Sequence, residues 1–330
     1  MTKLRNGVMG MLAVTGMALA ADPALLQMVP PTASAVAGMQ VDQGKRSAFG
    51  RYMLAKFGAS GDKATELMAE TGFDPRRDMS EVLFASEGPV AGGVSSGGLI
   101  LARGTFDPAR IAAAVRAKGG VATSFQGVDV LSGADAKQPW ALAFLDNTTA
   151  VVGDVSSVKA AVTQHAAGTP ASADLTAKVA LLSANNDFWF LTLAPISDLA
   201  GSMPDSGLGD TMQNGKMFQA ITQASGGVRF GDNVVVTADA VTRSDKDAQA
   251  LVDVVHFLAG MVQSGQQPGA TPQGMAALLS SLVLKADANV MHLSLSVPES
   301  QLESFLDSAR QRHVTPPPPA GLKPVVPQAN

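Results

Sequence analysis

One pattern of apolar and polar positions recurs several times along the chain. A short apolar strand leads to a polar capping residue, and an amphipathic helix follows. The strands of these units read "SAVAGMQVD", "GGLILARG", "TTAVVGD", "NVVVTADAV" and "NVMHLSLSV". The helix over residues 246–263 shows the pattern most clearly, with an apolar stripe made of Leu251, Val254, Val255, Leu258 and Val262. Such a stripe is typical of a helix that faces a core.

Further apolar runs pair as hairpins. Asp146-Asn147 separates the run "WALAFLD" from "TAVVGD", and Gly231-Asp232-Asn233 separates "GGVRF" from "VVVTADAV". Turn residues of this kind between two strands are a strong signal for antiparallel pairing. The pattern therefore predicts an α+β fold with a largely antiparallel sheet and helices packed on one face.

The order of elements divides the chain into two similar strand-rich halves. We predict a first α+β domain over 21–170 and a second over 171–313, with the boundary in the segment Gly168–Asp174. The second half is interpreted as a possible distant duplicate of the first. Residues 314–330 contain four consecutive prolines, which fit neither a helix nor a sheet, and we predict a disordered tail.

The N-terminus has the pattern of a secretory signal peptide over residues 1–20. Lys3 and Arg5 precede an apolar run, and Ala18-Leu19-Ala20 supplies a small-x-small cleavage motif. A membrane anchor is the alternative, but the run is shorter than the roughly 20 residues needed to span a bilayer. We predict cleavage after Ala20 or Ala21 and an exported protein, periplasmic or extracellular, without a further transmembrane segment.

Composition narrows the chemistry. The chain of 330 residues has no cysteine, so thiol catalysis, disulfides and cysteine-bound metals are excluded. Its formal net charge is -4 and only 5% of its residues are aromatic. Neither value suits nucleic-acid binding, which needs a basic patch or stacking platforms. The four histidines form no metal-binding pair and no phosphate-binding glycine motif occurs, so we expect no cofactor.

The tripeptide Phe-Asp-Pro occurs twice, at 73–75 and 106–108. Asp74 and Asp107 suit the cap position of a helix, and the proline after each suits the first helical position. The second copy predicts a full helix. The first predicts a single turn, because a strand pattern begins soon after it.

Two candidate sites remain open as alternatives. Ser95 and Ser96 lie in "GVSSG", which matches the G-x-S-x-G motif of serine hydrolases, but the motif precedes a strand where a nucleophile elbow needs a helix. The second candidate is an anion-binding site made of Arg76, Arg77, Arg103 and Arg110, which lie beside the two helix starts. Ordinary ion pairing of these arginines with Asp74, Asp78 and Asp107 is the competing interpretation.

The segments "LLQMVPPTASAVAGMQVDQ", "TGFDPRRDMSEVLFAS", "RGTFDPARI" and "AVTRSDKDAQALVDVVHFLAGM" resemble those of exported, uncharacterised proteins of the acidobacterial type. The resemblance covers most of the chain after residue 20 and implies export. It implies no activity, cofactor or catalytic residue.

The sequence favours a non-enzymatic binding or scaffold module of the cell envelope, whose partner is an unidentified envelope ligand or protein. The expected ligand surface is an exposed sheet face or a groove between the halves. An apolar cavity would favour a carrier, and a flat sheet would favour a scaffold.

Overall fold

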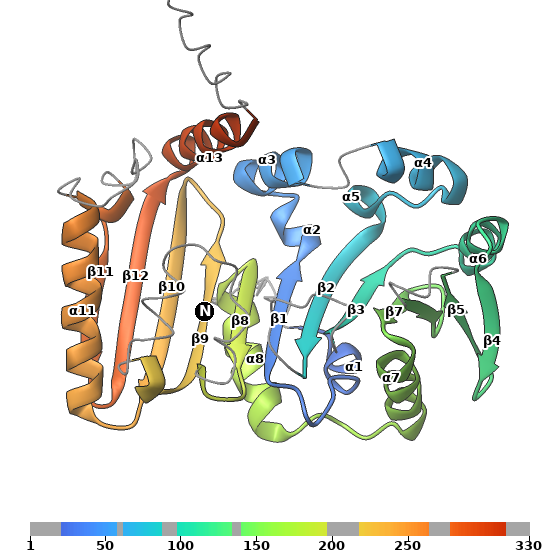
Figure 1. Ribbon diagram of the computed structural model, residues 1–330, viewed down its shortest axis with the longest axis horizontal. Coiled ribbons are helices and arrows are strands. Elements are labelled where there is room, and N and C mark those ends of the chain that lie inside the picture. Colours follow the sequence, from blue (N-terminus) through green and yellow to red (C-terminus); the bar gives the residue numbers. More distant parts are fainter. Residues whose placement is uncertain are drawn as a thin grey trace, which may run out of the picture.

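The computed structural model describes residues 21–57, 62–87, 98–133, 140–196, 218–263 and 278–314. Over these residues the strands form one twelve-stranded sheet in which every neighbouring pair is antiparallel (Figure 1). The strand order is β11-β12-β10-β9-β8-β1-β2-β3-β7-β6-β5-β4.

The strands are β1 (Ala35–Gln40), β2 (Met79–Ser86), β3 (Gly98–Gly104), β4 (Val121–Phe125), β5 (Val128–Ser132), β6 (Ala141–Phe144), β7 (Thr149–Gly153), β8 (Phe188–Thr192), β9 (Ile221–Arg229), β10 (Asn233–Thr242), β11 (Val283–Asp287) and β12 (Val290–Pro298). The helices are α1 (Pro23–Leu26), α2 (Val41–Gly44), α3 (Ala48–Phe57), α4 (Asp62–Thr71), α5 (Pro75–Asp78), α6 (Pro108–Ala117), α7 (Val155–Ala167), α8 (Ala173–Asn185), α11 (Asp245–Gln263) and α13 (Glu299–Val314), with a 3-10 turn, η3, at Phe218–Ala220.

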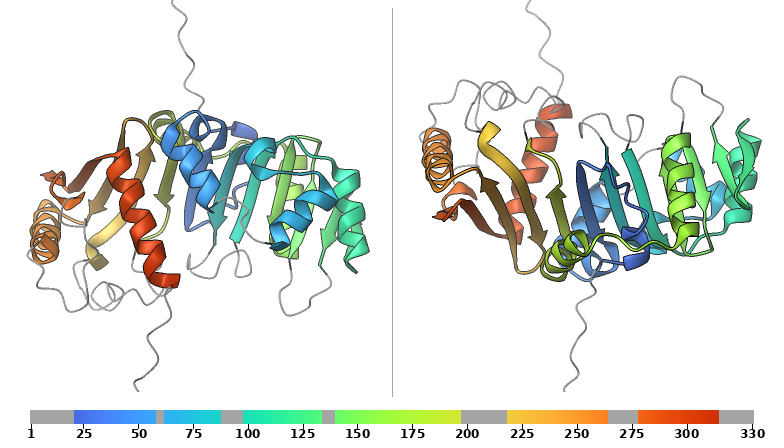
Figure 2. Two further views of the ribbon diagram at one scale, coloured as in Figure 1. Left: turned by 90° about the horizontal axis from the view of Figure 1, so that it is seen from above. Right: turned by 90° about the horizontal axis from the view of Figure 1, so that it is seen from below.

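Helices cover both faces of the sheet. Successive residues of a strand point to opposite faces, so Leu101 and Ile100 of β3 mark the two sides. Leu101 belongs to the main core, together with residues of α1, α7 and α8. Ile100 lines a cavity next to α6 on the other side. The two views of Figure 2, from above and below, show different helices in front.

The second half of the sheet has its own core under α11. Ala224, Ala240 and Met291 project from β9, β10 and β12 and pack with Leu251 and Val252 of the helix. The register places this row on the same face as Ile100. Thus α6 and α11 lie over the same face, one in each half of the sheet.

The structure confirms the predicted fold class and corrects some details of the predicted arrangement. The α+β class, the antiparallel sheet and both hairpins are confirmed, since β6 pairs with β7 and β9 with β10. Helices were expected on one face and lie on both. The sheet is also continuous across the expected domain boundary, because β1 pairs with β8. The predicted Pro-rich tail lies outside the described residues.

The two halves share a scheme of connections. In each half three consecutive strands lie side by side, a helix follows, and the chain returns so that its last strand pairs with the third. Thus β7 lies beside β3 and β12 beside β10. Duplication remains a prediction, and this common scheme is the feature that favours it.

Gly38 makes room for the buried Trp189 where the two halves meet. The residues are opposite each other in β1 and β8, and Trp189 is fully buried. A Cβ at position 38 would lie 2.4 Å from Cζ2 of the indole ring. The ring would have to shift within a packed core, so Gly38→Ala should lower the free energy of unfolding by about 1–3 kcal/mol.

Urea denaturation of the Gly38→Ala variant tests this expectation. Gly260→Ala is the matched control, because a Cβ at that exposed helical position meets nothing within 4 Å. Replacement of a helical glycine by alanine should raise stability by about 0.5–1 kcal/mol. Equal effects of the two substitutions would show that Gly38 is not needed for the contact between the halves.

Candidate ligand-binding cavity

The two Phe-Asp-Pro motifs begin α5 and α6 as the sequence predicts. The Asp74 carboxylate accepts a hydrogen bond from the backbone N–H of Arg76 at 3.0 Å, and Asp107 accepts one from that of Arg110 at 3.0 Å. A proline follows each cap. The first motif starts a single turn and the second a full helix, which confirms the expected difference in length.

The phenylalanines of the two motifs meet in space. The ring centroids of Phe73 and Phe106 lie 5.4 Å apart, and Phe144 of β6 lies 5.4 Å from Phe106. The motifs are far apart along the sequence, but β2 and β3 are neighbouring strands, which places the two helix starts side by side. The three rings form one aromatic cluster above the sheet.

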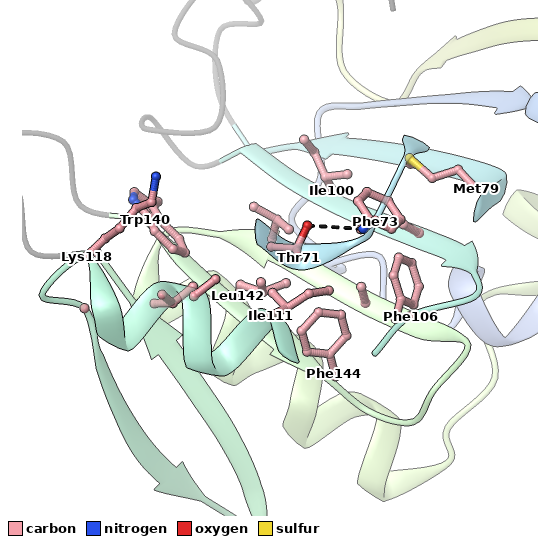
Figure 3. A pocket seen from close by; sticks show the side chains of 17 residues that line it. Thr71, Phe73, Met79, Ile100, Phe106, Ile111, Lys118, Trp140, Leu142 and Phe144 are labelled. Carbon is pink, nitrogen blue, oxygen red and sulfur yellow. Dashed lines mark hydrogen bonds between the residues drawn. The ribbon is translucent and has the colours of Figure 1, made fainter. Parts of the chain in front are cut away.

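This aromatic cluster lines one end of a cavity between α6 and the sheet (Figure 3). The cavity has a volume of about 650 Å³, within the roughly 300–1,000 Å³ that is usual for ligand sites. Its lining is overwhelmingly apolar: Thr71, Phe73, Met79, Ile100, Ala102, Phe106, Ile111, Ala114, Val115, Lys118, Gly120, Gly133, Trp140, Leu142, Phe144, Ala150 and Val152.

The register shows that the cavity is elongated. Its floor crosses β3, β7 and β6, because Ile100 is opposite Val152 and Val152 is opposite Leu142. It extends to Met79 of β2 on one side and to Gly133, just after β5, on the other. At about 4.8 Å between strands, these five strands span about 19 Å.

The two ends of the cavity differ in exposure. At the aromatic end Phe106 is 9% exposed, and Phe73 and Phe144 are partly buried. At the other end Trp140 is 36% exposed and the Lys118 side chain 49% exposed. The opening of the cavity therefore lies at Lys118 and Trp140.

Ion pairs and helix caps attach α4 to α6 beside this opening. Lys118 Nζ lies 2.9 Å from Glu66 Oε1 and 3.1 Å from Glu70 Oε2. These hydrogen bonds raise the pKa of Lys118 above its ordinary value, so the ammonium is charged at neutral pH. Arg110 donates from Nε to the Glu70 carbonyl at 3.0 Å and from Nη2 to the Ala69 carbonyl. It thereby satisfies carbonyls that the end of α4 leaves free.

The structure separates the four arginines of the expected anion site. Arg77 donates to the Gly72 carbonyl at 2.8 Å, close to the carbonyls that Arg110 binds. Arg76 pairs with Asp74 on the exposed side of α5. Arg103 is on the opposite sheet face, where its Nε lies 2.5 Å from Asp22 Oδ2.

Each of these guanidinium groups is engaged with a carboxylate or a carbonyl. Hydrogen bonds from Arg76 and Arg77 lower the pKa of Asp74 and Asp78, respectively. The ion pairs with Asp74 and Asp78 match the competing interpretation, whereas Asp107 acts as a helix cap. Anion binding by the cluster stays a prediction.

The other candidates that the structure describes do not line the cavity. Ser95 and Ser96 lie outside the described residues. His292 lies on β12, with Nδ1 2.7 Å from Asp239 Oδ1. His256 lies on α11 and is exposed. Among the described residues no cluster of three or more His, Asp or Glu could hold a metal.

Sequence reasoning missed the cavity itself. Its lining comes from separate strands and helices, and each apolar residue alone has the pattern of an ordinary core residue. Phe73 and Phe106 gave the available signal, because both precede a helix cap and need an apolar partner.

None of the helices in the described part of the chain has the length and apolar character that a membrane span needs.

These features define an α+β protein with an elongated apolar cavity on one face of a continuous antiparallel sheet. No family model matches the sequence, and no curated protein matches it. The fold is similar to that of a solved structure, crystal form IV of TP0453, with a TM-score of 0.50 and 10% sequence identity. The match covers 86% of this chain and 96% of that chain, so the likeness extends over both halves of the sheet.

Loss of the α6 cap should weaken the wall of the cavity. Asp107→Ala leaves an N–H at the start of α6 without its partner and should lower the free energy of unfolding by about 1 kcal/mol. Asp107→Asn retains a capping oxygen and should cost clearly less. Chemical denaturation of both variants measures the difference, and equal losses would mean that the carboxylate does not act as a cap.

Proposed function

We propose that the chain is an exported, non-enzymatic binding protein of the cell envelope that carries an elongated apolar ligand in this cavity. One observation supports the proposal above all: a space of about 650 Å³ lined almost wholly by hydrocarbon and aromatic groups. Protein interiors are close-packed, and empty space of this size forfeits dispersion contacts. A ligand that fills the cavity would restore those contacts.

The shape favours a single aliphatic chain. The cavity extends across several strands and has aromatic rings at one end, so a flexible chain can extend from the opening to the Phe73–Phe106 pair. The polar end of such a ligand would lie at the opening, beside Trp140. Lys118 is already bound by two carboxylates, so the apolar body of the ligand supplies most of the binding energy.

Export and placement in the envelope belong to the same proposal. They are supported by the basic and apolar start of the sequence and its Ala18-Leu19-Ala20 motif. We also propose membership among the exported, uncharacterised proteins of the acidobacterial type, on the segments that resemble theirs. A carrier for an apolar ligand would be of use there, since aliphatic compounds dissolve poorly in water.

A homologous series of straight-chain alcohols tests the function. Each added methylene that enters the cavity contributes about 0.8 kcal/mol, so affinity should rise about fourfold per methylene until the cavity is full. Binding can be followed by the fluorescence of Trp140, which lies at the opening, with Trp140→Phe as the control because Trp189 is fully buried. Affinity that is weak and independent of chain length would contradict a carrier of aliphatic ligands.

A bulky side chain that projects from α6 into the cavity should weaken ligand binding. Ala114 lines the cavity, so Ala114→Phe should weaken binding of a long-chain alcohol more than tenfold by occupying its space. Ala113 is the neighbouring residue, is exposed and does not line the cavity, so Ala113→Phe is the matched control. Calorimetric titration of both variants decides the outcome, and equal affinities would show that the ligand binds elsewhere.

A further inference from the structure

The segment that follows the predicted signal peptide is part of the main core. Ala21 is 4% exposed, and Leu25 and Met28 are fully buried. These residues pack on the sheet face opposite the cavity, against Leu83, Leu101 and other core residues. The first residues after the predicted cleavage site are therefore fixed within the fold.

Two buried side chains bind the backbone of this segment at its first two residues. The N–H of Ala21 donates to Ser183 Oγ of α8 at 3.0 Å, and Ser183 itself donates to the Val179 carbonyl at 2.7 Å. The N–H of Asp22 lies 3.2 Å from both carboxylate oxygens of Glu81. Ser183 is 1% exposed and Glu81 7% exposed, so both groups lie away from water.

The charges around Glu81 do not balance. The Asp22 side chain caps α1 and pairs with Arg103, which also donates to Thr148 and Thr149. Among the charged groups that the structure places at Glu81, two carboxylates thus share one guanidinium. A buried carboxylate without its own counter-ion is costly. Burial, together with the nearby Asp22, raises the pKa of Glu81 to about 7, although the Asp22 N–H, the Gln40 side chain and the charge of Arg103 oppose this.

We infer that the α-ammonium group released when the signal peptide is removed is the counter-ion of Glu81. Cleavage before Ala21 would put this group at the Ser183 hydroxyl, one residue from the N–H that Glu81 binds. It would add the one positive charge that Asp22, Glu81 and Arg103 lack together. Ser183 can accept from the ammonium because its own proton is donated to Val179.

The covalent step is hydrolysis of the Ala20–Ala21 peptide bond. Water, acting with a signal peptidase, supplies the oxygen of the new Ala20 carboxylate, and the Ala21 nitrogen becomes a free amine. An α-amino group has an ordinary pKa of about 8, so it is protonated at neutral pH. This inference rests on the export part of the proposed function and is independent of ligand binding.

The pairing gives a defined pH dependence. Without the ammonium, folded Glu81 retains its proton between its unfolded pKa, near 4.5, and about 7, so stability falls as pH rises through that window. With the ammonium, Glu81 ionises at lower pH and this loss is smaller. While Glu81 is ionised, the contribution of the amine is complete below about pH 8, the ordinary pKa of an α-amino group, and is lost as pH rises further. At pH 4 Glu81 is protonated, so the ion pair is absent there as well. The stability gained from the amine should therefore be greatest near pH 7–8.

The decisive comparison uses the chain from Ala21 to Asn330 with a free amine and the same chain with Nα-acetyl-Ala21. The acetyl group replaces the preceding peptide unit without a charge. Near pH 7.5 the unfolding constant should be about tenfold larger for the acetylated chain, one pKa unit being a factor of ten. The difference should shrink at pH 4 and at pH 10. Equal stability of the two chains at all pH values would overturn the inference.

Two substitutions test whether Glu81 is the partner of the α-ammonium group. Glu81→Gln should abolish the difference between the free and acetylated chains. Asp129→Asn, which changes an exposed carboxylate on β5, should leave it intact. Should Glu81→Gln fail to fold, NMR titration of the free amine in the unaltered chain decides instead. A pKa clearly above 8 supports the pair, and an unshifted or lower value rejects it.

Sequencing the N-terminus of the protein from its own cells tests the processing separately. Ala21 as the first residue supports the inference, and so does Asp22, whose nitrogen is already in contact with Glu81. An uncleaved chain would overturn both the inference and the proposed export. It would leave the alcohol-binding experiments of the cavity unaffected, so the two failures can be told apart.

Discussion

The pairing of β1 with β8 is the interaction on which the rest of the structure depends. Each half has its own strands and helices, and this one antiparallel ladder makes them a single sheet. The ladder requires close packing at one point, where Trp189 covers Gly38. Because the sheet is continuous, side chains alternate between its two faces in the same register in both halves. Helices α6 and α11 therefore lie over the same face.

The two halves share one scheme of strand connections, so the difference in packing under α6 and under α11 is informative. Under α11, Leu251, Val252 and Met291 fill the space between the helix and the sheet. Under α6, Ala114 of the helix and Ala102 and Ala150 of the floor are small residues that line the cavity. Small side chains at facing positions of the helix and the sheet leave space between them. The same arrangement of elements thus gives a closed core in one half and a cavity in the other.

Local signals in the sequence predicted much of the fold. Both Phe-Asp-Pro helix starts and the two hairpins depend on neighbouring residues, and all are confirmed. Helix α11 forms where its periodicity predicts it, but the predicted stripe was wrong in detail. The buried face of α11 consists of Ala248, Leu251, Val252 and Ala259, and the other four residues of the predicted stripe are only partly buried. The edge strand β4 was missed because its residues are largely exposed and lack an apolar alternation. The edge strand β11 was missed because it is short, and its alternation rests on only two apolar residues that face the core, Leu284 and Ala286. Helix α8 was missed because "GTPASAD" was interpreted as a boundary. The cavity and the Phe73–Phe106 contact depend on which strands are neighbours, which periodicity does not determine.

The two faces of the same strands connect the N-terminal segment with the cavity. In β3, Leu99 and Leu101 pack on the core that includes Leu25 and Met28, while Ile100 and Ala102 form the cavity floor. Structure around a cavity relaxes only partially, and how far it relaxes depends on how its walls are packed. Here the floor of the cavity is backed by the dense core on the opposite face, and the segment from Ala21 supplies part of that core. The N-terminal segment and the cavity are therefore in contact with opposite faces of the same strands.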